Sequence, residues 1–169
     1  MITANRHTIL ATVIASAIFV IYSAVYPLSA VAADTGAPDV PAEAEVKADP
    51  FAVAMAAGRA AVKVKNWSQA AKQFDIAVQR NPKNADAHNM LAYSSRNLND
   101  YPRAKKHYDE ALRLDPNHRG AHEYAGVMYL KLNQLPEAQK YLAALEKICG
   151  KKCEEYDDLS RAIVAYGKK

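Results

Sequence analysis

The sequence predicts an all-α protein: a right-handed α-solenoid of three helix hairpins, closed by a further helix at its C-terminal end. Three observations support this prediction. Matching residues recur at a fixed spacing, apolar residues within each copy follow helical spacing, and capping residues and prolines mark where helices begin and end. A fixed period in this range is typical of solenoids, in which each hairpin buries its apolar stripe against the next one.

The repeat is clearest in one column of alanines. Ala70, Ala104 and Ala138 lie 34 positions apart, and the same shift aligns further columns of similar side chains. These columns are Phe74, Tyr108 and Leu142; Ala77, Ala111 and Leu145; Gly58, Ala92 and Gly126; and Trp67, Tyr101 and Leu135. Three units follow, at 51–84, 85–118 and 119–152, and we expect their apolar residues to form one continuous core.

Each unit is expected to contain two helices, and the middle unit shows their limits. Asp100 is placed to cap the second helix, and Pro102 falls in its first turn, where the missing N–H matters little. Asp115 precedes a proline, which pushes it out of the α region and ends that helix. Asn84 is placed to cap the first helix of the same unit.

Two columns of small residues predict how the helices of a hairpin meet. Gly58 and Ala70 represent these columns in the first unit, and they fit where two helices cross closely. The bulky column that contains Phe74 is then expected to fill the space beside the crossing.

Residues 153–167 predict the capping helix. Leu159, Ile163 and Tyr166 stand at i, i+4 and i+7, while charged residues occupy the other face. The acids of the segment EEYDD stand at the helix start, where they interact favourably with the helix dipole. Gly167 is expected to end the helix, and a terminal unit with a polar outer face keeps a solenoid soluble.

The middle unit resembles the tetratricopeptide repeat (TPR) family, because Leu91, Ala104, Tyr108, Ala111 and Pro116 stand at the family's offsets. The other two units match at Gly58, Ala70, Phe74, Ala77 and Pro82, and at Gly126, Tyr129 and Ala138. The family's Trp column instead holds Ala54, His88 and His122. The resemblance implies a solenoid of three TPR hairpins, and the segment CEEY is similar to the tail of small exported bacterial TPR proteins.

The resemblance also implies that the first helices of the units line a concave groove for a protein or peptide partner. The implied groove residues are Arg59, Lys63, Asn89, Tyr93, Arg96, Glu123 and Lys131. The basic side chains among them make the expected groove net positive, and Tyr93 offers a rigid aromatic contact. That these charges are merely solvated is the alternative. The Lys and Asn pattern of the family's carboxylate-clamp subset is only partly present.

The N-terminal residues 1–33 predict a secretory signal peptide. Arg6 and His7 precede an apolar run from Thr8 to Tyr26, and small residues around Ala32 suit cleavage there or after Ala33. The run is also near the length of a membrane span, so a retained inner-membrane anchor is the alternative. Both interpretations place the repeats outside the cytoplasm, in the periplasm or otherwise exported. Residues 34–50, rich in Ala, Pro and acids, predict a disordered linker.

Cys149 and Cys153 are expected to form a disulfide, because an exported chain meets an oxidising environment. Residues at i and i+4 of an unbroken helix are too far apart for this bond, so it requires a turn, which Gly150 can supply. A redox-active pair is the alternative. It usually has C-x-x-C spacing, whereas this chain has C-x-x-x-C.

Other chemistry finds little support in the sequence. His118 and His122 are four residues apart, and His88 lies one period before His122, but packing or surface roles are favoured over a metal site. We expect no metal, no cofactor and no catalytic residue, because no phosphate loop or nucleophile–base set is present. The formal charge of +4 is mild and no basic cluster interleaves with aromatics, so nucleic acid is not an expected partner.

The favoured function is therefore that of a non-enzymatic, exported adaptor that scaffolds an envelope assembly by binding a protein or peptide. One alternative is a thiol-redox accessory factor that uses Cys149 and Cys153. Another is a membrane-anchored assembly factor, in which the N-terminal segment is retained and contacts the membrane.

Overall fold

A computed structural model describes residues 48–168 and shows an array of paired helices. The first four helices are α1 (Pro50–Lys63), α2 (Trp67–Arg80), α3 (Ala85–Asn97) and α4 (Tyr101–Leu114). They are followed by α5 (Arg119–Lys131), α6 (Leu135–Cys149), the short 3₁₀ helix η1 (Gly150–Lys152) and α7 (Glu154–Tyr166). The predicted signal peptide or anchor, and the linker up to residue 47, lie outside the described residues.

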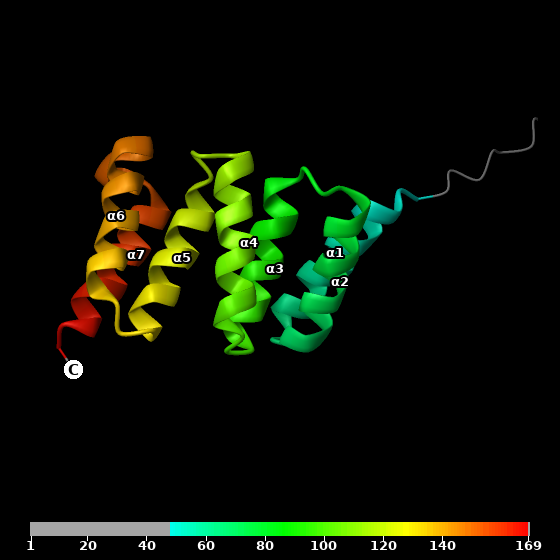
Figure 1. Cartoon of the computed structure of the whole chain (residues 1–169), viewed down its shortest axis with the longest axis horizontal. Helices are drawn as coiled ribbons and strands as arrows, with labels where there is room; N and C mark the ends of the chain where they lie inside the picture. The colour runs from blue at the N-terminus through cyan, green and yellow to red at the C-terminus, as the bar shows by residue number, and fades with distance from the viewer. Residues whose placement is uncertain (1–47, 169) are drawn as a thin grey trace, which may run out of the picture. The chain divides into compact units, whose positions relative to one another are not determined.

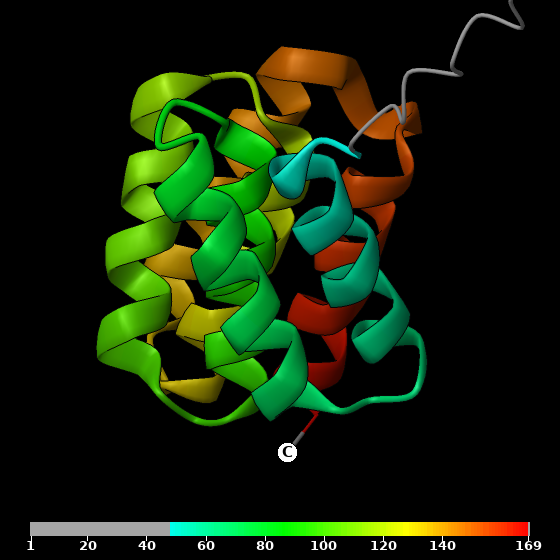
Figure 2. The ribbon, with the colours of Figure 1, turned by 90° about the vertical axis from the view of Figure 1, so that its right-hand side faces the viewer.

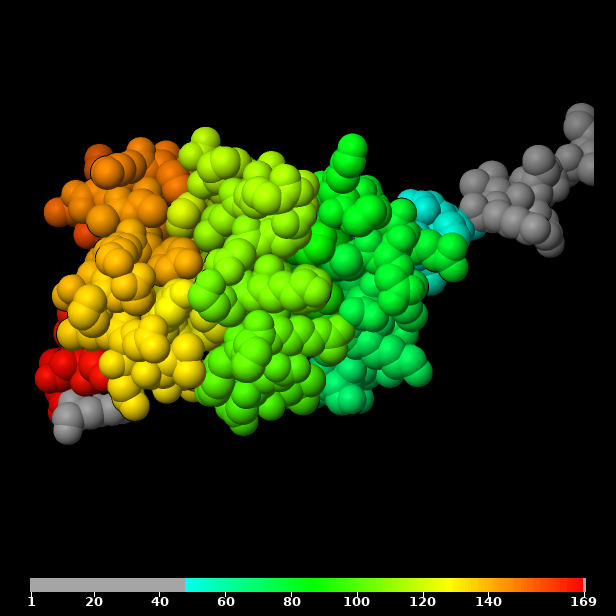
Figure 3. Space-filling view, in the orientation of Figure 1, coloured from blue at the N-terminus to red at the C-terminus, as the bar shows by residue number. Residues whose placement is uncertain are grey.

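The helices form hairpins that stack in chain order, as Figure 1 shows from α1 and α2 at one end to α6 and α7 at the other. In the end-on view of Figure 2, α1 and α7 lie on one side of the molecule and α4 lies on the other. The space-filling view in Figure 3 shows each hairpin as one band of the surface. Within 48–168 there is no strand, so the predicted all-α solenoid of helix hairpins is confirmed.

The predicted capping residues occupy the positions expected of them. The side chain of Asn84 accepts from the backbone N–H of Ala87 at 2.8 Å, and that of Asp100 accepts from Arg103 at 3.2 Å. Helix α4 ends at Leu114, directly before the residue that precedes proline. Local side-chain chemistry therefore sets these helix limits, because each cap satisfies an N–H that has no partner within the helix.

The turns inside the hairpins repeat as regularly as the helices. Lys65, Asn99 and Asn133 each have a positive φ, of 55°, 62° and 57°. These residues are 34 positions apart, so the backbone shares the period of the sequence. Asn adopts this left-handed conformation more readily than other side chains, whereas Lys65 holds it against its own preference.

The small column is confirmed in the first hairpin but works differently in the third. A Cβ on Gly58 would lie 2.5 Å from the Phe74 ring, which explains the need for glycine at that crossing. A Cβ on Gly126 would instead lie 2.6 Å from Leu159 of α7. Leu142, the expected filler, is only half-buried. Within residues 48–168 the helix that follows the last hairpin is α7, and its Leu159 fills this space.

The expectation of one continuous core is wrong, because the buried apolar residues form two clusters. The first cluster centres on Phe74 and ends at Leu91, and the second begins at Ala92 and extends to Leu159. The division falls within α3, whose buried residues also include five polar or charged ones. These are His88, Asn89, Ser94, Ser95 and Arg96. Polar side chains on this central helix separate the apolar surfaces on either side of it.

Helix α7 closes the array against both helices of the last hairpin. Leu159 is fully buried, and Ile163 and Tyr166 pack against the second cluster, as the predicted apolar stripe requires. The helix ends at Tyr166, directly before Gly167. In the part of the chain that the structure describes, none of the helices has both the length and the apolar character needed to cross a bilayer.

Candidate functional site

One face of the array carries three clefts, and we call it the leading face because residues of α1, α3, α5 and α7 form most of it. The first cleft, of about 280 Å³, lies between α1 and the start of α3. The second, of about 480 Å³, lies where α3, α5 and α7 begin. The third, of about 520 Å³, lies between α5 and α7 beside the start of α4. The predicted groove residues lie on α1, α3 and α5, and two of them, Arg59 and Lys131, line these clefts.

The two basic residues of the first hairpin are open to solvent. Arg59 and Lys63 are exposed on α1, one turn apart. The Nη2 atom of Arg59 lies 3.9 Å from the Oδ2 atom of Asp86 on α3, and both side chains are more than half exposed. An exposed pair at that distance contributes little to stability, so Arg59 can exchange Asp86 for a carboxylate of a partner.

Arg96 is buried rather than open to the groove. Its guanidinium lies over the rings of Tyr93 and Tyr124, at 5.0 and 5.6 Å from their centroids. The centroids of the two tyrosine rings are 4.7 Å apart, and the Trp67 ring meets the Tyr93 ring edge-on with 5.7 Å between centroids. The sequence therefore pointed to Tyr93 but missed Tyr124 and Trp67, which come from the neighbouring helices. Arg96 acts mainly as a cation that holds α3 against α5.

Carboxylates of α7 make the leading face around Glu123 more acidic than the sequence predicted. Glu123 is half-buried on α5, and its pKa is raised to about 7, mainly by burial. Asp158, Glu155 and Glu154 of α7 contribute to this rise, while Arg96 opposes it. The prediction of a net positive groove included no residue of α7. With Arg96 buried and these carboxylates added, positive charge remains mainly at Arg59, Lys63 and Lys131.

The second cleft is lined by polar residues that already have partners. The Nε2 atom of His118 donates to Oδ1 of Asp86 at 3.1 Å, while its Nδ1 atom accepts from the backbone N–H of Ala121. Arg119 lies 3.5 Å from Glu155 of α7. Asn89, also predicted to line the groove, is buried beneath Gly120. The polar residues of this cleft therefore bond the first turns of α3, α5 and α7 to one another, and they do not offer unpaired charges.

The third cleft is mostly apolar and contains the remaining predicted residue, Lys131. Its lining comes from α5, α7, the first residue of α4 and one turn residue: Tyr101, Val127, Leu130, Lys131, Asn133, Ala162, Ala165 and Tyr166. The hydroxyl of Tyr166 donates to Oδ1 of Asn133 at 3.3 Å, which ties the end of α7 to the turn of the last hairpin.

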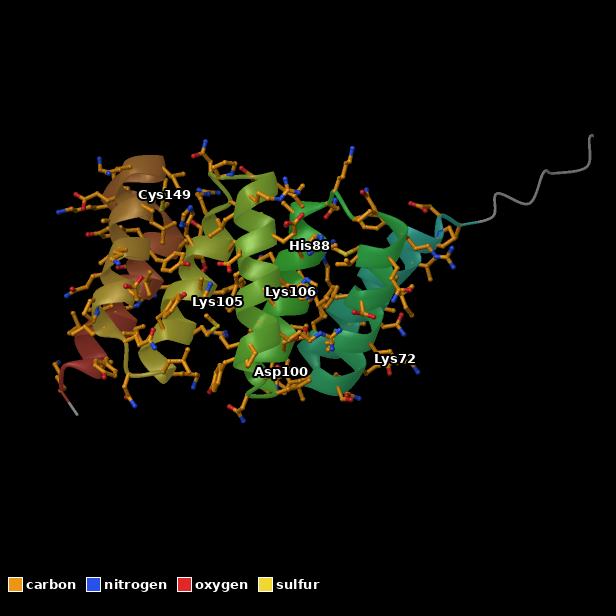
Figure 4. All side chains as sticks on the ribbon, in the orientation of Figure 1. Lys72, His88, Asp100, Lys105, Lys106 and Cys149 are labelled. Atoms are coloured by element: carbon orange, nitrogen blue, oxygen red, sulfur yellow. A yellow bond between two sulfur atoms is a disulfide. The ribbon has the colours of Figure 1, made fainter. Side chains whose placement is uncertain are left out.

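The two histidines of the repeat column bond to the loops that connect successive hairpins. The Nε2 atom of His88 donates to the carbonyl of Pro82 at 3.1 Å, and that of His122 donates to Pro116 at 2.9 Å. His88, labelled in Figure 4, also meets His107 of α4, with their Nδ1 atoms 3.0 Å apart. The side chains of His88 and His122 therefore each bond to the loop that precedes their own helix. Among residues 48–168, no group of three or more potential ligands could hold a metal ion.

The two cysteines lie where the sequence required a turn. Helix α6 ends at Cys149, which is labelled in Figure 4, and Gly150 follows with a φ of 70°. The Cα atoms of Cys149 and Cys153 are 5.9 Å apart, and the Sγ atoms are at the bonding distance of 2.05 Å. This geometry places the pair between the last hairpin and α7.

Comparison with known proteins agrees with the geometry. Two sequence profiles described as tetratricopeptide repeat match residues 85–118 and 55–96. No curated protein matches the chain.

Several solved structures resemble the fold. The Arabidopsis OM64 TPR domain is 19% identical, with a TM-score of 0.63 over 69% of this chain and 96% of that domain. The TPR2B domain of yeast Sti1, in a complex with an Hsp70 component, is 16% identical, with a TM-score of 0.65 over 70% and 97%. The first TPR of Spaghetti (RPAP3), bound to the HSP90 peptide SRMEEVD, is 18% identical, with a TM-score of 0.61 over 70% and 94%.

Proposed function

The chain is a tetratricopeptide repeat protein, and we propose that it is a non-enzymatic adaptor whose leading face holds a protein or peptide partner. We further propose that it is exported and scaffolds an assembly in the cell envelope. The observation that carries the proposal is the row of three clefts along the leading face, formed by every second helix of the array.

The chemistry of the leading face suits a polypeptide partner. It combines exposed cations on α1, a cluster of aromatic rings at Tyr93 and Tyr124, and an apolar cleft beside α7. Interfaces use aromatic and arginine side chains as anchors and surround them with polar contacts. Two of the similar domains are described in complexes with Hsp70 or an HSP90 peptide, and this likeness of fold supports the same kind of role here.

The proposal of export rests on the sequence. The apolar run from Thr8 to Tyr26 is followed by small residues near Ala32, as in a secretory signal peptide. An oxidising environment also suits the paired cysteines, which are the only two in the chain. In that setting the Cys149–Cys153 bond would be structural and would fasten the capping helix to the last hairpin.

Capture of partners from an envelope extract tests the function. The full chain serves as bait, beside the double variant Arg59→Glu and Lys63→Glu, which reverses the exposed charges of the leading face. The matched control is Lys72→Glu with Lys106→Glu, both exposed on the second helices of their hairpins and labelled in Figure 4. We expect the first variant to lose partners that the wild type and the control retain.

The same captured material reports on export. N-terminal sequencing of the bait is expected to begin at Ala33 or Asp34, as cleavage after Ala32 or Ala33 requires. A partner set unchanged by the leading-face variant contradicts the role proposed for the exposed cations of α1. An intact N-terminus in the membrane fraction contradicts only the cleavage, and favours the anchored alternative.

A further inference from the structure

The third cleft is the largest of the three, most of its lining is apolar, and it contains one charged residue. Val127 and Leu130 of α5 form one wall, and Ala162 and Ala165 of α7 form the other. Small side chains on α7 leave the space between these helices open. At about 520 Å³, the cleft is in the size range of pockets that enclose a ligand group.

Two tyrosines frame this cleft. Tyr101 stands at the first position of α4, and its hydroxyl donates to Oδ1 of Asn99 at 3.0 Å. Tyr166 stands at the last position of α7 and donates to Asn133. Because each hydroxyl has a partner, each ring is held in place and presents its apolar surface. Rigid aromatic walls of this kind favour the seating of a side chain at an interface.

The charge of the cleft is set by one residue. Lys131 is the single charged side chain in the lining, it is exposed, and no carboxylate lies within ion-pair distance of it among residues 48–168. The cleft therefore offers an apolar recess with an unpaired ammonium at its edge. The matching occupant has an apolar side chain with a carboxylate beside it.

We propose that this cleft is the anchor site for a partner segment in which a large apolar residue is followed by Asp or Glu. The apolar side chain enters between α5 and α7, and the carboxylate lies against Lys131. This inference rests on the proposed adaptor function and adds to it the chemistry of the partner. It also makes the capping helix part of the binding surface.

The test uses three short peptides, acetylated and amidated at their ends, and the isotope-labelled full chain. The first has the sequence Gly-Ser-Leu-Asp-Ser-Gly, the second replaces Leu by Ser, and the third replaces Asp by Lys. We expect the first peptide to give saturable chemical-shift changes at the backbone amides of Val127, Leu130 and Ala165. The Ser peptide should bind about tenfold more weakly and the Lys peptide about threefold more weakly, since one apolar burial or one exposed ion pair is then lost.

Two variants connect the shifts to the cleft. Ala165→Trp fills it and should abolish the shifts, while Lys131→Glu should reverse the preference between the Asp and Lys peptides. The matched controls are Ala143→Trp and Lys147→Glu, both at exposed positions of α6, and these should bind as the wild type does. Equal binding of the three peptides, shifts centred elsewhere, or no shift at millimolar peptide would each overturn the proposal.

Partner capture then separates this inference from the function on which it rests. If Ala165→Trp keeps all partners while Arg59→Glu with Lys63→Glu loses them, the cleft is not the anchor but the adaptor function stands. If both variants keep every partner, both proposals fail.

Discussion

His88 shows how single residues join the hairpins. Its Nε2–H donates to the carbonyl of Pro82, so in its neutral form the Nδ1 atom is an acceptor. His107 must then donate from its own Nδ1–H across the 3.0 Å that separates the two atoms. This pair can carry one added proton, but a second one would place two N–H groups against each other.

His107 is expected to make the stability of the array depend on pH. Its pKa is lowered to about 4, mainly by burial. His88, Arg103 and Lys106 contribute to this fall, while Asp75 opposes it. The unfolded value is near 6.5, so the stabilising contribution of neutral His107 is complete above pH 6.5 and is lost as the pH falls towards 4. We expect the free energy of unfolding to fall by about 1–2 kcal/mol over this range, a value reduced for solvent screening because the side chain is half-exposed.

Denaturant unfolding at several pH values measures this effect as the difference between the wild type and His107→Gln. The free energy of unfolding of the variant should depend less steeply on pH between pH 6.5 and 4. His122→Gln is the control. Like His88, His122 donates to a proline carbonyl, but it has no bond to a second histidine. If the free energies of unfolding of the wild type and His107→Gln changed with pH in parallel, the proposed effect of His107 would be refuted.

Among the helices, α7 depends on one close contact with α5. The absence of a side chain at Gly126 lets Leu159 lie against the α5 backbone, where it is fully buried. The predicted capping role of α7 is thus carried out by a leucine packed on a glycine. Contacts of this kind leave no room for an added methyl group unless the helix moves.

Gly126→Ala is expected to destabilise the protein by about 1–3 kcal/mol, because the new Cβ overlaps the Leu159 side chain. Thermal or denaturant unfolding measures the loss. In the double variant with Leu159→Ala, the two effects should be non-additive, since the clash is removed with the leucine. Gly120→Ala is the control on the same helix, as its Cβ would come no closer than 3.3 Å to the Asn89 amide and 3.6 Å to the His118 ring. Equal effects at the two glycines would contradict this role of Gly126.

Comparing elements explains what the sequence could and could not predict. Helix limits followed from Asn84, Asp100 and Asp115, because caps and prolines act on their own neighbours. The partner of Gly126 did not follow from the repeat, since Leu159 lies outside the third unit. The burial of Arg96 was missed for a similar reason: it depends on Tyr124, which comes from a different hairpin. Contacts between units need geometry that a period alone does not supply.

At the scale of the whole molecule, the two apolar clusters differ in composition. Each contains six alanines, but their larger members differ. The first, around α1 and α2, adds only Met55, Phe74 and Leu91. The second adds Tyr108, Met128, Tyr129, Leu130, Leu145 and Leu159, and more partly buried apolar residues pack against it than against the first. Because the first cluster has fewer large side chains, it buries less apolar surface, and we expect the first hairpin to contribute less to stability.

Solenoids open locally, because each unit contacts only its neighbours. We therefore expect amide hydrogen exchange to be fastest in α1 and α2 and slowest in α5 and α6. The difference in protection should be at least about tenfold, equivalent to roughly 1.4 kcal/mol. Exchange followed by mass spectrometry, under conditions where closing outpaces exchange, measures it peptide by peptide. Uniform protection from α1 to α7 would show that the array opens as one unit and that the division within α3 has no energetic effect.

The residues with left-handed backbone conformation at 65, 99 and 133 affect how such a chain can gain or lose repeats. Each reverses the backbone in the same conformation, whether the side chain is Lys or Asn. If a segment as long as one repeat were inserted or removed between two of these turns, its ends would join the chain through turns of the same conformation. The span of the protein along a partner can thus be lengthened or shortened in whole hairpins, with no new geometry needed at any joint.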